Sequence, residues 1–279
     1  MHIHNALLKG LFSLWILASA LVASATAELK LNAQHAIAIN NETGQVLVEK
    51  NADAAVPIAS LTKLMTAMVV LDSKAPMGEK INIVEDDIYT FKYSSSRVRV
   101  GTTLERAELL RLALMSSDNR AAAALARTYP GGMPAFLAAV RKKMITLGMT
   151  HSVIEEPTGL SPNNMSTAQD LAKMAAAAAK YPEIRDITTN KTELFTLNGR
   201  PLTFHNTNRL VGATGWEVLM SKTGFTNEAG HCLIMRIKEA GQSATLVLLN
   251  TRAITSSVLD AGKIRQLLSQ SSQAAAHPR

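Results

Sequence analysis

The segment Pro57-Ile-Ala-Ser-Leu-Thr-Lys-Leu-Met-Thr-Ala-Met68 places a Ser-x-x-Lys pair, Ser60 and Lys63, at the start of a helical pattern. Two polar strings follow it in the 279-residue chain, Ser117-Asp-Asn119 and then Lys222-Thr-Gly224. Each string alone has an ordinary structural explanation: a helix cap, a turn, and the solvated end of a strand. All three in this order are typical of an active site built around a serine nucleophile.

The Ser-x-x-Lys pair has a spacing that suits proton transfer. Residues three apart on a helix lie on the same face, so the Ser60 hydroxyl is expected beside the Lys63 amine. A serine hydroxyl is a poor nucleophile until a neighbour takes its proton. Lysine can take it only when neutral, and its reference pKa is about 10.4. Burial and a second cation both lower this pKa, and Lys222 is the candidate for that cation.

The Ser-Asp-Asn string offers a second hydroxyl to the same chemistry. If the Ser117 hydroxyl bridges Lys63 and Lys222, it can pass the proton on to a departing amine. Asp118 is expected to be structural and to tie down the turn.

The remaining polar residues suit substrate binding. Asn119 offers both a donor and an acceptor to a peptide bond of the substrate. Lys222 and Thr223 are candidates for holding a substrate carboxylate. Gly224 would let a substrate backbone lie along the strand edge, because it has no Cβ in the way.

Strand signals come from both ends of the chain, and helix signals fill its middle. Asn198-Gly199 predicts a hairpin turn, Ser166-Thr-Ala-Gln169 a capping box, and Pro182 the end of the helix that this box opens. Strands are predicted at residues 35–40, 45–49, 194–197, 201–204, 217–222, 231–237 and 244–250. Helices are predicted from residue 57 onward, on both sides of 116–119 within 104–128, and at 134–147, 166–180 and 256–268.

These elements predict an α/β (α+β) fold with one mostly antiparallel sheet formed by both chain ends and flanked by helices. A helical subdomain is expected as an insertion at roughly residues 70–190, within a catalytic domain at 28–269. Residues 270–279 form a small polar tail that is expected to be disordered.

The first 27 residues have the pattern of a secretory signal peptide, with a lysine before an apolar stretch and a small-residue site at Ala25-Thr-Ala27. The alternative, an uncleaved anchor, is disfavoured because the apolar core is short for a membrane span. Cleavage after Ala27 would remove one lysine and no acid, which lowers the formal charge from +7 to +6. We therefore expect a periplasmic protein without a stable membrane anchor, whose basic charge suits an anionic cell-wall polymer.

Cys232 is the only cysteine, so an intrachain disulfide is excluded. Its strand-like, apolar surroundings favour a buried structural thiol over a nucleophile. The histidines lack the spacing of metal ligands, and no nucleic-acid motif is present. The sequence therefore predicts no metal, no cofactor and no nucleic-acid partner.

The chain resembles the low-molecular-weight penicillin-binding proteins of the D-alanyl-D-alanine carboxypeptidase family, and especially their periplasmic D,D-endopeptidases. The resemblance covers roughly residues 30–268 and is carried by the blocks 57–68, Leu114–Ala121, Glu156-Pro-Thr-Gly-Leu-Ser161, Asn206-Thr-Asn208 and 222–227. It implies a β-lactamase/transpeptidase-like fold. It also implies peptidoglycan stem peptides as substrates, β-lactams as covalent inhibitors, and other cell-wall enzymes as candidate partners.

The resemblance also implies roles for individual residues. Ser60 would be the acylated nucleophile, Lys63 the general base and Ser117 the proton shuttle, while Lys222 would be the substrate-binding cation. The backbone N–H groups of Ser60 and Phe225 would form the oxyanion hole.

Two other functions are compatible with the same motifs. A class A-like β-lactamase would need a glutamate that activates the deacylating water, for which Glu155 or Glu156 are candidates. Their loop is one residue longer than the β-lactamase pattern and lacks the asparagine expected beside that water. A catalytically idle penicillin-binding scaffold would not need Ser60, Lys63, Ser117 and Lys222 together. The residues do not choose between cutting a cross-link and removing a terminal D-alanine, so the endopeptidase prediction rests on the resemblance alone.

Overall fold

A five-stranded antiparallel sheet forms the centre of the protein. The computed structural model describes residues 29–89, 92 and 94–276, and the expected signal peptide lies outside this range. The strand order is β2 (Val46–Lys50), β1 (His35–Asn40), β11 (Gln242–Thr251), β10 (Gly230–Glu239) and β9 (Glu217–Thr226). β1 pairs with β11 in the register Ala36 to Leu248, so the two ends of the chain meet inside one sheet, as predicted.

Alternate side chains of the sheet enter two hydrophobic clusters on its opposite faces. One cluster combines Ala36, Met235 and Leu246 with Ala261 and Ile264 of α7 (Ile254–Ala276). The larger cluster places Ile37, Ile234 and Val247 against α1 (Thr62–Asp72) and α5 (Ala168–Ala178). Burial on both faces fixes the strand register, because a slip of one residue would exchange the two sets.

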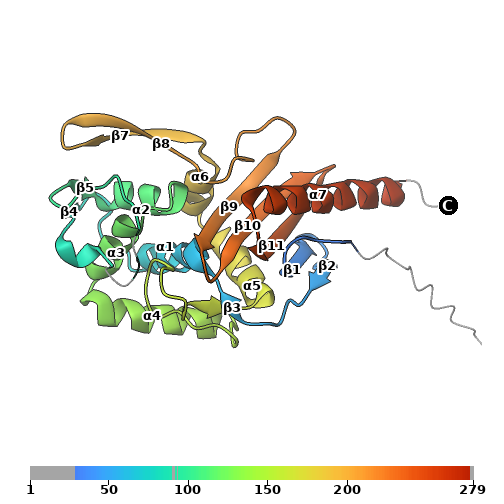
Figure 1. Ribbon diagram of the computed structural model, residues 1–279, viewed down its shortest axis with the longest axis horizontal. Coiled ribbons are helices and arrows are strands. Elements are labelled where there is room, and N and C mark those ends of the chain that lie inside the picture. Colours follow the sequence, from blue (N-terminus) through green and yellow to red (C-terminus); the bar gives the residue numbers. More distant parts are fainter. Residues whose placement is uncertain (1–28, 90–91, 93, 277–279) are drawn as a thin grey trace, which may run out of the picture.

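The other helices lie between the two sheet-forming ends of the chain: α2 (Arg106–Met115), α3 (Asn119–Arg127), α4 (Gly132–Thr146) and α6 (Pro182–Thr189). Figure 1 shows α2, α3 and α4 together at one end of the molecule and β1, β2 and α7 at the other. The long hairpin of β7 (Thr192–Leu197) and β8 (Arg200–His205) turns at Asn198 and Gly199, both with positive φ, as predicted. The division of the chain into a helical subdomain at residues 70–190 stays a prediction.

Short elements complete the frame around the site. β3 (Val56–Pro57) pairs with β6 (Met165–Ser166), and β4 (Lys80–Asn82) pairs with β5 (Thr103–Glu105). Two 3-10 turns, η1 (Ala59–Leu61) and η2 (Glu85–Asp87), precede α1 and follow β4. Within the described range, no helix has the length and apolar character needed to span a membrane.

The helix α5 ends at Ala178, before Pro182 as predicted, and Pro182 then opens α6, because proline is tolerated at the first helical position. Two sequence predictions were wrong. The cap of α5 is Thr167, whose hydroxyl accepts from the Asp170 N–H, and not Ser166. The tail predicted as disordered is helical from residue 270 to 276, since α7 continues to Ala276.

Candidate active site

Ser60 lies in the 3-10 turn η1, directly before α1, and not in the first turn of the α-helix itself. Two glycines enclose this turn. Gly159 has φ +83°, and a Cβ on it would come within 1.9 Å of the Ala59 carbonyl oxygen. A Cβ on Gly224 would lie 3.0 Å from the Ser60 backbone nitrogen. The missing Cβ of Gly224 therefore makes room for the turn that carries Ser60, and the predicted role of Gly224 in substrate binding stays a prediction.

Lys63 is 1% exposed, and its ammonium group is held by three oxygens. Nζ donates to Ser60 Oγ at 2.9 Å, to Asn119 Oδ1 at 2.7 Å and to the Thr158 carbonyl at 2.7 Å. The predicted Ser60–Lys63 contact is therefore present. The three acceptors fix the direction of Nζ relative to the serine hydroxyl.

Burial lowers the pKa of Lys63 to about 8, while the nearby Glu156 and Asp118 carboxylates oppose this shift. A pKa near 8 leaves about a tenth of the lysine neutral at pH 7, far more than the reference lysine pKa of about 10.4 would. Lys63 is thus suited to accept the Ser60 proton.

Ser117 and Lys222 form the second half of the polar cluster. Ser117 has φ +62°, which turns the chain sharply between α2 and α3. Lys222 Nζ donates to Ser117 Oγ and to the Thr223 carbonyl, both at 2.9 Å. The predicted contact of Ser117 with Lys222 is present, whereas Lys63 directs its own bonds to Ser60, Asn119 and Thr158.

Lys222 is also 1% exposed, and burial together with the positive charge of Lys63 lowers its pKa well below the usual lysine value. The sequence assigned the cation role to Lys222 and the neutral role to Lys63. In the structure the Glu156 and Asp118 carboxylates oppose the lowering of the Lys63 pKa, whereas the positive charge of Lys63 adds to the lowering of the Lys222 pKa.

The Ser-Asp-Asn turn has the predicted structural Asp118, but its Asn119 contacts Lys63, which the sequence did not predict. Asp118 caps α3 by accepting from the Ala121 N–H at 2.9 Å, and its other oxygen accepts from Ser96 Oγ at 2.7 Å. Asp118 is therefore structural. The carbonyl oxygen of Asn119 is taken up by Lys63, which leaves its amide group as the part suited to a substrate.

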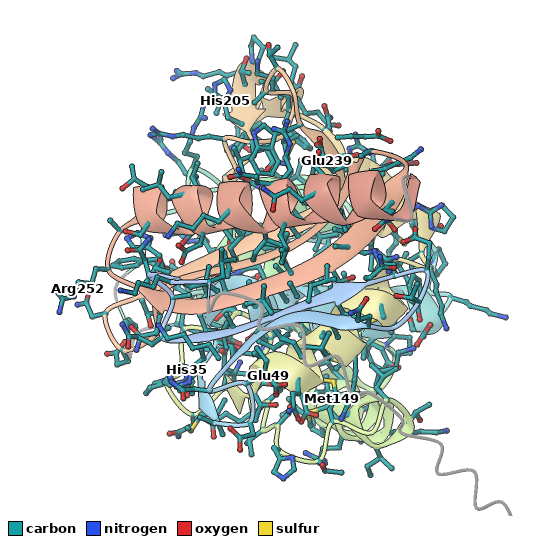
Figure 2. All side chains as sticks on the ribbon, turned by 90° about the vertical axis from the view of Figure 1, so that its right-hand side faces the viewer. His35, Glu49, Met149, His205, Glu239 and Arg252 are labelled. Carbon is teal, nitrogen blue, oxygen red and sulfur yellow. The ribbon has the colours of Figure 1, made fainter. Side chains whose placement is uncertain are left out.

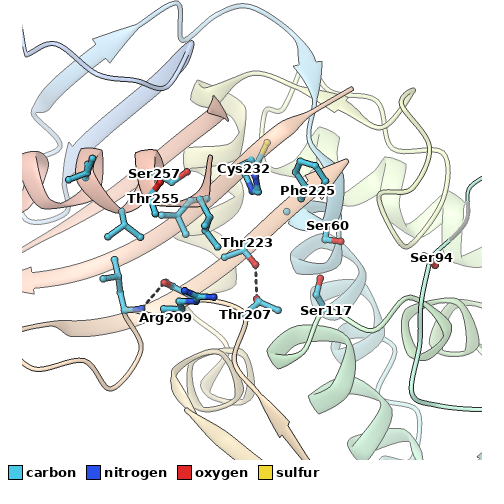
Figure 3. A pocket seen from close by; sticks show the side chains of 18 of the residues that line it. Ser60, Ser94, Ser117, Thr207, Arg209, Thr223, Phe225, Cys232, Thr255 and Ser257 are labelled. Carbon is cyan, nitrogen blue, oxygen red and sulfur yellow. Dashed lines mark hydrogen bonds between the residues drawn. The ribbon is translucent and has the colours of Figure 1, made fainter. Parts of the chain in front are cut away.

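The site opens into a cavity of about 770 Å³, which we call the Ser60 cavity. Figure 3 shows Ser60 and Ser117 near one side of this cavity and Arg209 near the other, with Thr223 between them. Thr223 Oγ1 donates to Thr207 Oγ1 at 2.6 Å, which joins β9 to the loop after β8. Phe225, 55% exposed, stacks on His231 at 4.4 Å between ring centroids. The cavity therefore runs along β9, the edge strand of the sheet.

The loop at residues 155–164 contributes contacts that sequence reasoning missed. Both Glu156 carboxylate oxygens accept hydrogen bonds from this loop, with donors at the Thr158, Gly159 and Ser161 N–H groups, Thr158 Oγ1 and Asn164 Nδ2. This network holds the Thr158 carbonyl against Lys63. The sequence signal for this network was a glutamate, Glu156, followed within eight residues by Thr, Gly, Ser and Asn, which supply many short-range hydrogen-bond donors.

Cys232 is 2% exposed, and burial raises the pKa of its thiol to about 11, so the predicted burial of this thiol is confirmed. Among the residues that the structure describes, no three His, Cys, Asp or Glu side chains gather as metal ligands would. Figure 2 shows the charged and polar side chains His35, Glu49, His205, Glu239 and Arg252 distributed over the outer surface.

Comparisons with known proteins agree with this geometry. A family model described as D-alanyl-D-alanine carboxypeptidase matches residues 22–253. The D-alanyl-D-alanine endopeptidase of Pseudomonas aeruginosa is 46% identical over 235 residues, which cover 84% of this chain and 76% of that protein. The enzyme of the same name from Escherichia coli is 42% identical over 232 residues, covering 82% and 75%.

Solved structures have the same fold. The Streptomyces K15 DD-transpeptidase superposes with a TM-score of 0.79 at 27% identity, covering 85% of this chain and 97% of that one. Penicillin-Binding Protein D2 from Listeria monocytogenes, in a cefotaxime-bound form, gives a TM-score of 0.75 at 27% identity, covering 86% and 98%. The predicted fold and the predicted resemblance are confirmed, and the chain belongs to the D-alanyl-D-alanine carboxypeptidase family of serine peptidases.

Proposed function

We propose that this serine D-Ala–D-Ala peptidase cleaves peptidoglycan stem peptides, both at cross-links and at terminal D-alanine, through an ester on Ser60. The observation that carries the proposal is the buried contact of Lys63 Nζ with Ser60 Oγ at 2.9 Å, in surroundings that lower the lysine pKa to about 8. A hydroxyl paired with a neutral amine is an activated nucleophile.

The reaction begins when neutral Lys63 takes the Ser60 proton and Oγ attacks the carbonyl carbon of a D-alanine. The backbone N–H groups of Ser60 and Phe225 hold the oxyanion that develops. The leaving amine receives its proton through Ser117, which is hydrogen bonded to Lys222. Water then attacks the ester and restores the Ser60 hydroxyl.

The substrate adds to the open edge of β9 as a further strand. Thr223 and Lys222 hold the carboxylate of the leaving residue, and a carboxylate there would favour the protonated form of Lys222 because opposite charges stabilise each other. The Asn119 amide donates to a peptide carbonyl. Gly224 keeps Ser60 close to the strand on which the substrate lies.

A class A-like β-lactamase is less well supported. Glu156 is 7% exposed, and its carboxylate is satisfied by its own loop. Glu155 accepts from Ser161 Oγ and Asn163 Nδ2. Because loop donors occupy both oxygens of Glu156 and one oxygen of Glu155, few acceptor positions are left to orient a deacylating water. An idle scaffold is disfavoured by the assembled Ser60–Lys63 contact.

We also propose that the enzyme is periplasmic after cleavage behind Ala27, and that β-lactams acylate Ser60 because they are similarly attacked at a carbonyl. The relative from Listeria monocytogenes described in a cefotaxime-bound form supports the second proposal. Other cell-wall enzymes remain candidate partners.

Digestion of purified cross-linked muropeptides tests the activity. The mature protein should convert dimers to monomers and should be labelled by a fluorescent penicillin, whereas Ser60→Ala should do neither. Labelling of the alanine variant equal to that of wild type would overturn the assignment of Ser60.

A further inference from the structure

The Ser60 cavity continues well beyond the residues that perform the chemistry. We call the part past Thr223 the distal half; its lining includes Arg209, Leu210, Ile254, Val258 and Leu259. Figure 3 places Arg209, Thr255 and Ser257 on the side of Thr223 away from Ser60. A leaving group whose first carboxylate is held at Thr223 therefore extends into the distal half. A single alanine ends at that carboxylate and leaves this space unfilled.

The charge of the distal half favours an anion. Among the described residues that line the whole cavity, Arg209 is the only side chain with a permanent charge, and none is Asp or Glu. Arg209 itself is exposed, and no ion pair holds its guanidinium within the described part of the chain. A guanidinium without a carboxylate of its own is a ready partner for a carboxylate of a ligand.

Arg209 stands on a loop that is fixed on both sides. The Asn206 amide donates to the Thr188 and Asn190 carbonyls, both at 3.0 Å, and the Thr207 N–H donates to the Met115 carbonyl at 3.1 Å. The Asn208 Oδ1 accepts from the Leu210 N–H at 3.0 Å, across Arg209. A side chain on an anchored loop loses less freedom when it binds a ligand.

The opposite wall is apolar and accessible. Ile254 and Leu259, from the start of α7, are 37% and 62% exposed. Together with Val258 and Leu210 they form an apolar surface that suits the methylene chain of a diamino acid. The distal half thus combines one cation with an aliphatic wall.

We propose that the distal half binds the leaving strand of a cross-linked substrate, with Arg209 pairing with a carboxylate that lies beyond the one at Thr223. This inference rests on the proposed cleavage of cross-links. In a cross-link the leaving amine belongs to a diamino acid of a second stem peptide, so the leaving group carries further residues and carboxylates. A terminal D-alanine has none of these. Arg209 is therefore a specificity-determining residue that favours cross-linked over terminal substrates.

The test compares two substrates and three variants. The kcat/KM is measured for a cross-linked muropeptide dimer and for a monomeric stem pentapeptide ending in two D-alanines. Arg209→Ala should lower the value for the dimer about tenfold, because a charge-assisted hydrogen bond is lost, and should leave the pentapeptide unchanged within about twofold. Arg209→Lys should retain part of the preference. Arg200→Ala, an equal charge change on the exposed surface of β8, should behave like wild type.

A dimer whose leaving-strand carboxylates beyond the Thr223 position are amidated sharpens the test. Wild type should cleave it about tenfold more slowly than the free acid, whereas Arg209→Ala should not distinguish the two. Equal cleavage of the dimer by wild type and Arg209→Ala, or an equal loss on dimer and pentapeptide, would overturn the Arg209 subsite alone. A wild-type protein that removes D-alanine but leaves every dimer intact would overturn the proposed cross-link cleavage as well.

Discussion

The two halves of the Ser60 cavity differ in how far their key side chains are buried. On the Ser60 side, Lys63 and Lys222 are each 1% exposed, and their partners Asn119, Thr158 and Ser117 lie far from them in the sequence. On the distal side, Leu259 is 62% exposed and Arg209 is exposed. Buried polar groups depend on exact partners, because an unsatisfied group in a low-dielectric site is costly. The reactive groups therefore depend on burial, whereas the exposed side chains proposed to set specificity can change at little cost in stability.

Lys63→Arg should produce the largest effect. Arginine keeps the charge but cannot lose its proton in a protein, so it cannot serve as the base. The rate of acylation by a penicillin should fall on the order of 100- to 10,000-fold. Stopped-flow measurement of the acyl-enzyme checks this, with Lys173→Arg, an exposed lysine on α5, as the matched control. A rate within about tenfold of wild type would remove Lys63 as the base.

Lys222→Ala should slow acylation less, on the order of tenfold to a hundredfold, since it removes the partner of Ser117 and of the substrate carboxylate. Coupling between two titrating groups is mutual, so losing a charge at Lys222 should raise the pKa of Lys63. The acidic limb of the pH–rate profile would then move to higher pH, and a shift of one unit corresponds to about 1.4 kcal/mol. An unmoved limb with weakened binding would keep the substrate role of Lys222 and reject the electrostatic one.

Much of the catalytic half could be predicted from the sequence, because the Ser-x-x-Lys spacing is a local helical property. The hairpin at Asn198-Gly199 was also predictable from local sequence, because two adjacent residues that favour positive φ are enough to specify such a turn. Thr158 was missed because only its backbone carbonyl takes part, and any residue type supplies one. The opposing effect of Glu156 and Asp118 on the Lys63 pKa was missed because it depends on how these two carboxylates pack in three dimensions.

Glu156→Gln tests the contact between the Thr158 carbonyl and Lys63, which the Glu156 network holds in place. A neutral amide offers one oxygen in place of two and turns an NH2 group toward backbone donors. The free energy of unfolding should fall by about 2 kcal/mol, which lowers the Tm by roughly 4–8 °C for a domain of this size. Acylation should slow about tenfold as the Thr158 carbonyl shifts. Differential scanning calorimetry and penicillin labelling measure both effects. A stable variant that instead accumulates acyl-enzyme would support the β-lactamase role of this glutamate.

Leu259→Ser should have the smallest effect, and it tests whether the distal half of the cavity tolerates substitution. The side chain is largely exposed, so stability should change by less than about 0.5 kcal/mol, and penicillin acylation should stay at the wild-type rate. The matched buried change, Leu64→Ser on α1, should cost several kcal/mol, because it leaves a cavity and an unpaired hydroxyl in the core. Comparable losses in both variants would show that the distal half is as tightly packed as the catalytic half.

The pH dependence of wild-type acylation tests the central claim, that a buried and neutral Lys63 activates Ser60. Only the deprotonated lysine can take the serine proton, so the second-order rate of acylation by a penicillin should rise with pH and reach half its maximum near pH 8, the pKa of Lys63. The measurement runs from about pH 6 to about pH 10 at constant ionic strength, with circular dichroism recorded at each pH as a control for folding. A rate that stays flat across this range in folded protein would contradict the account.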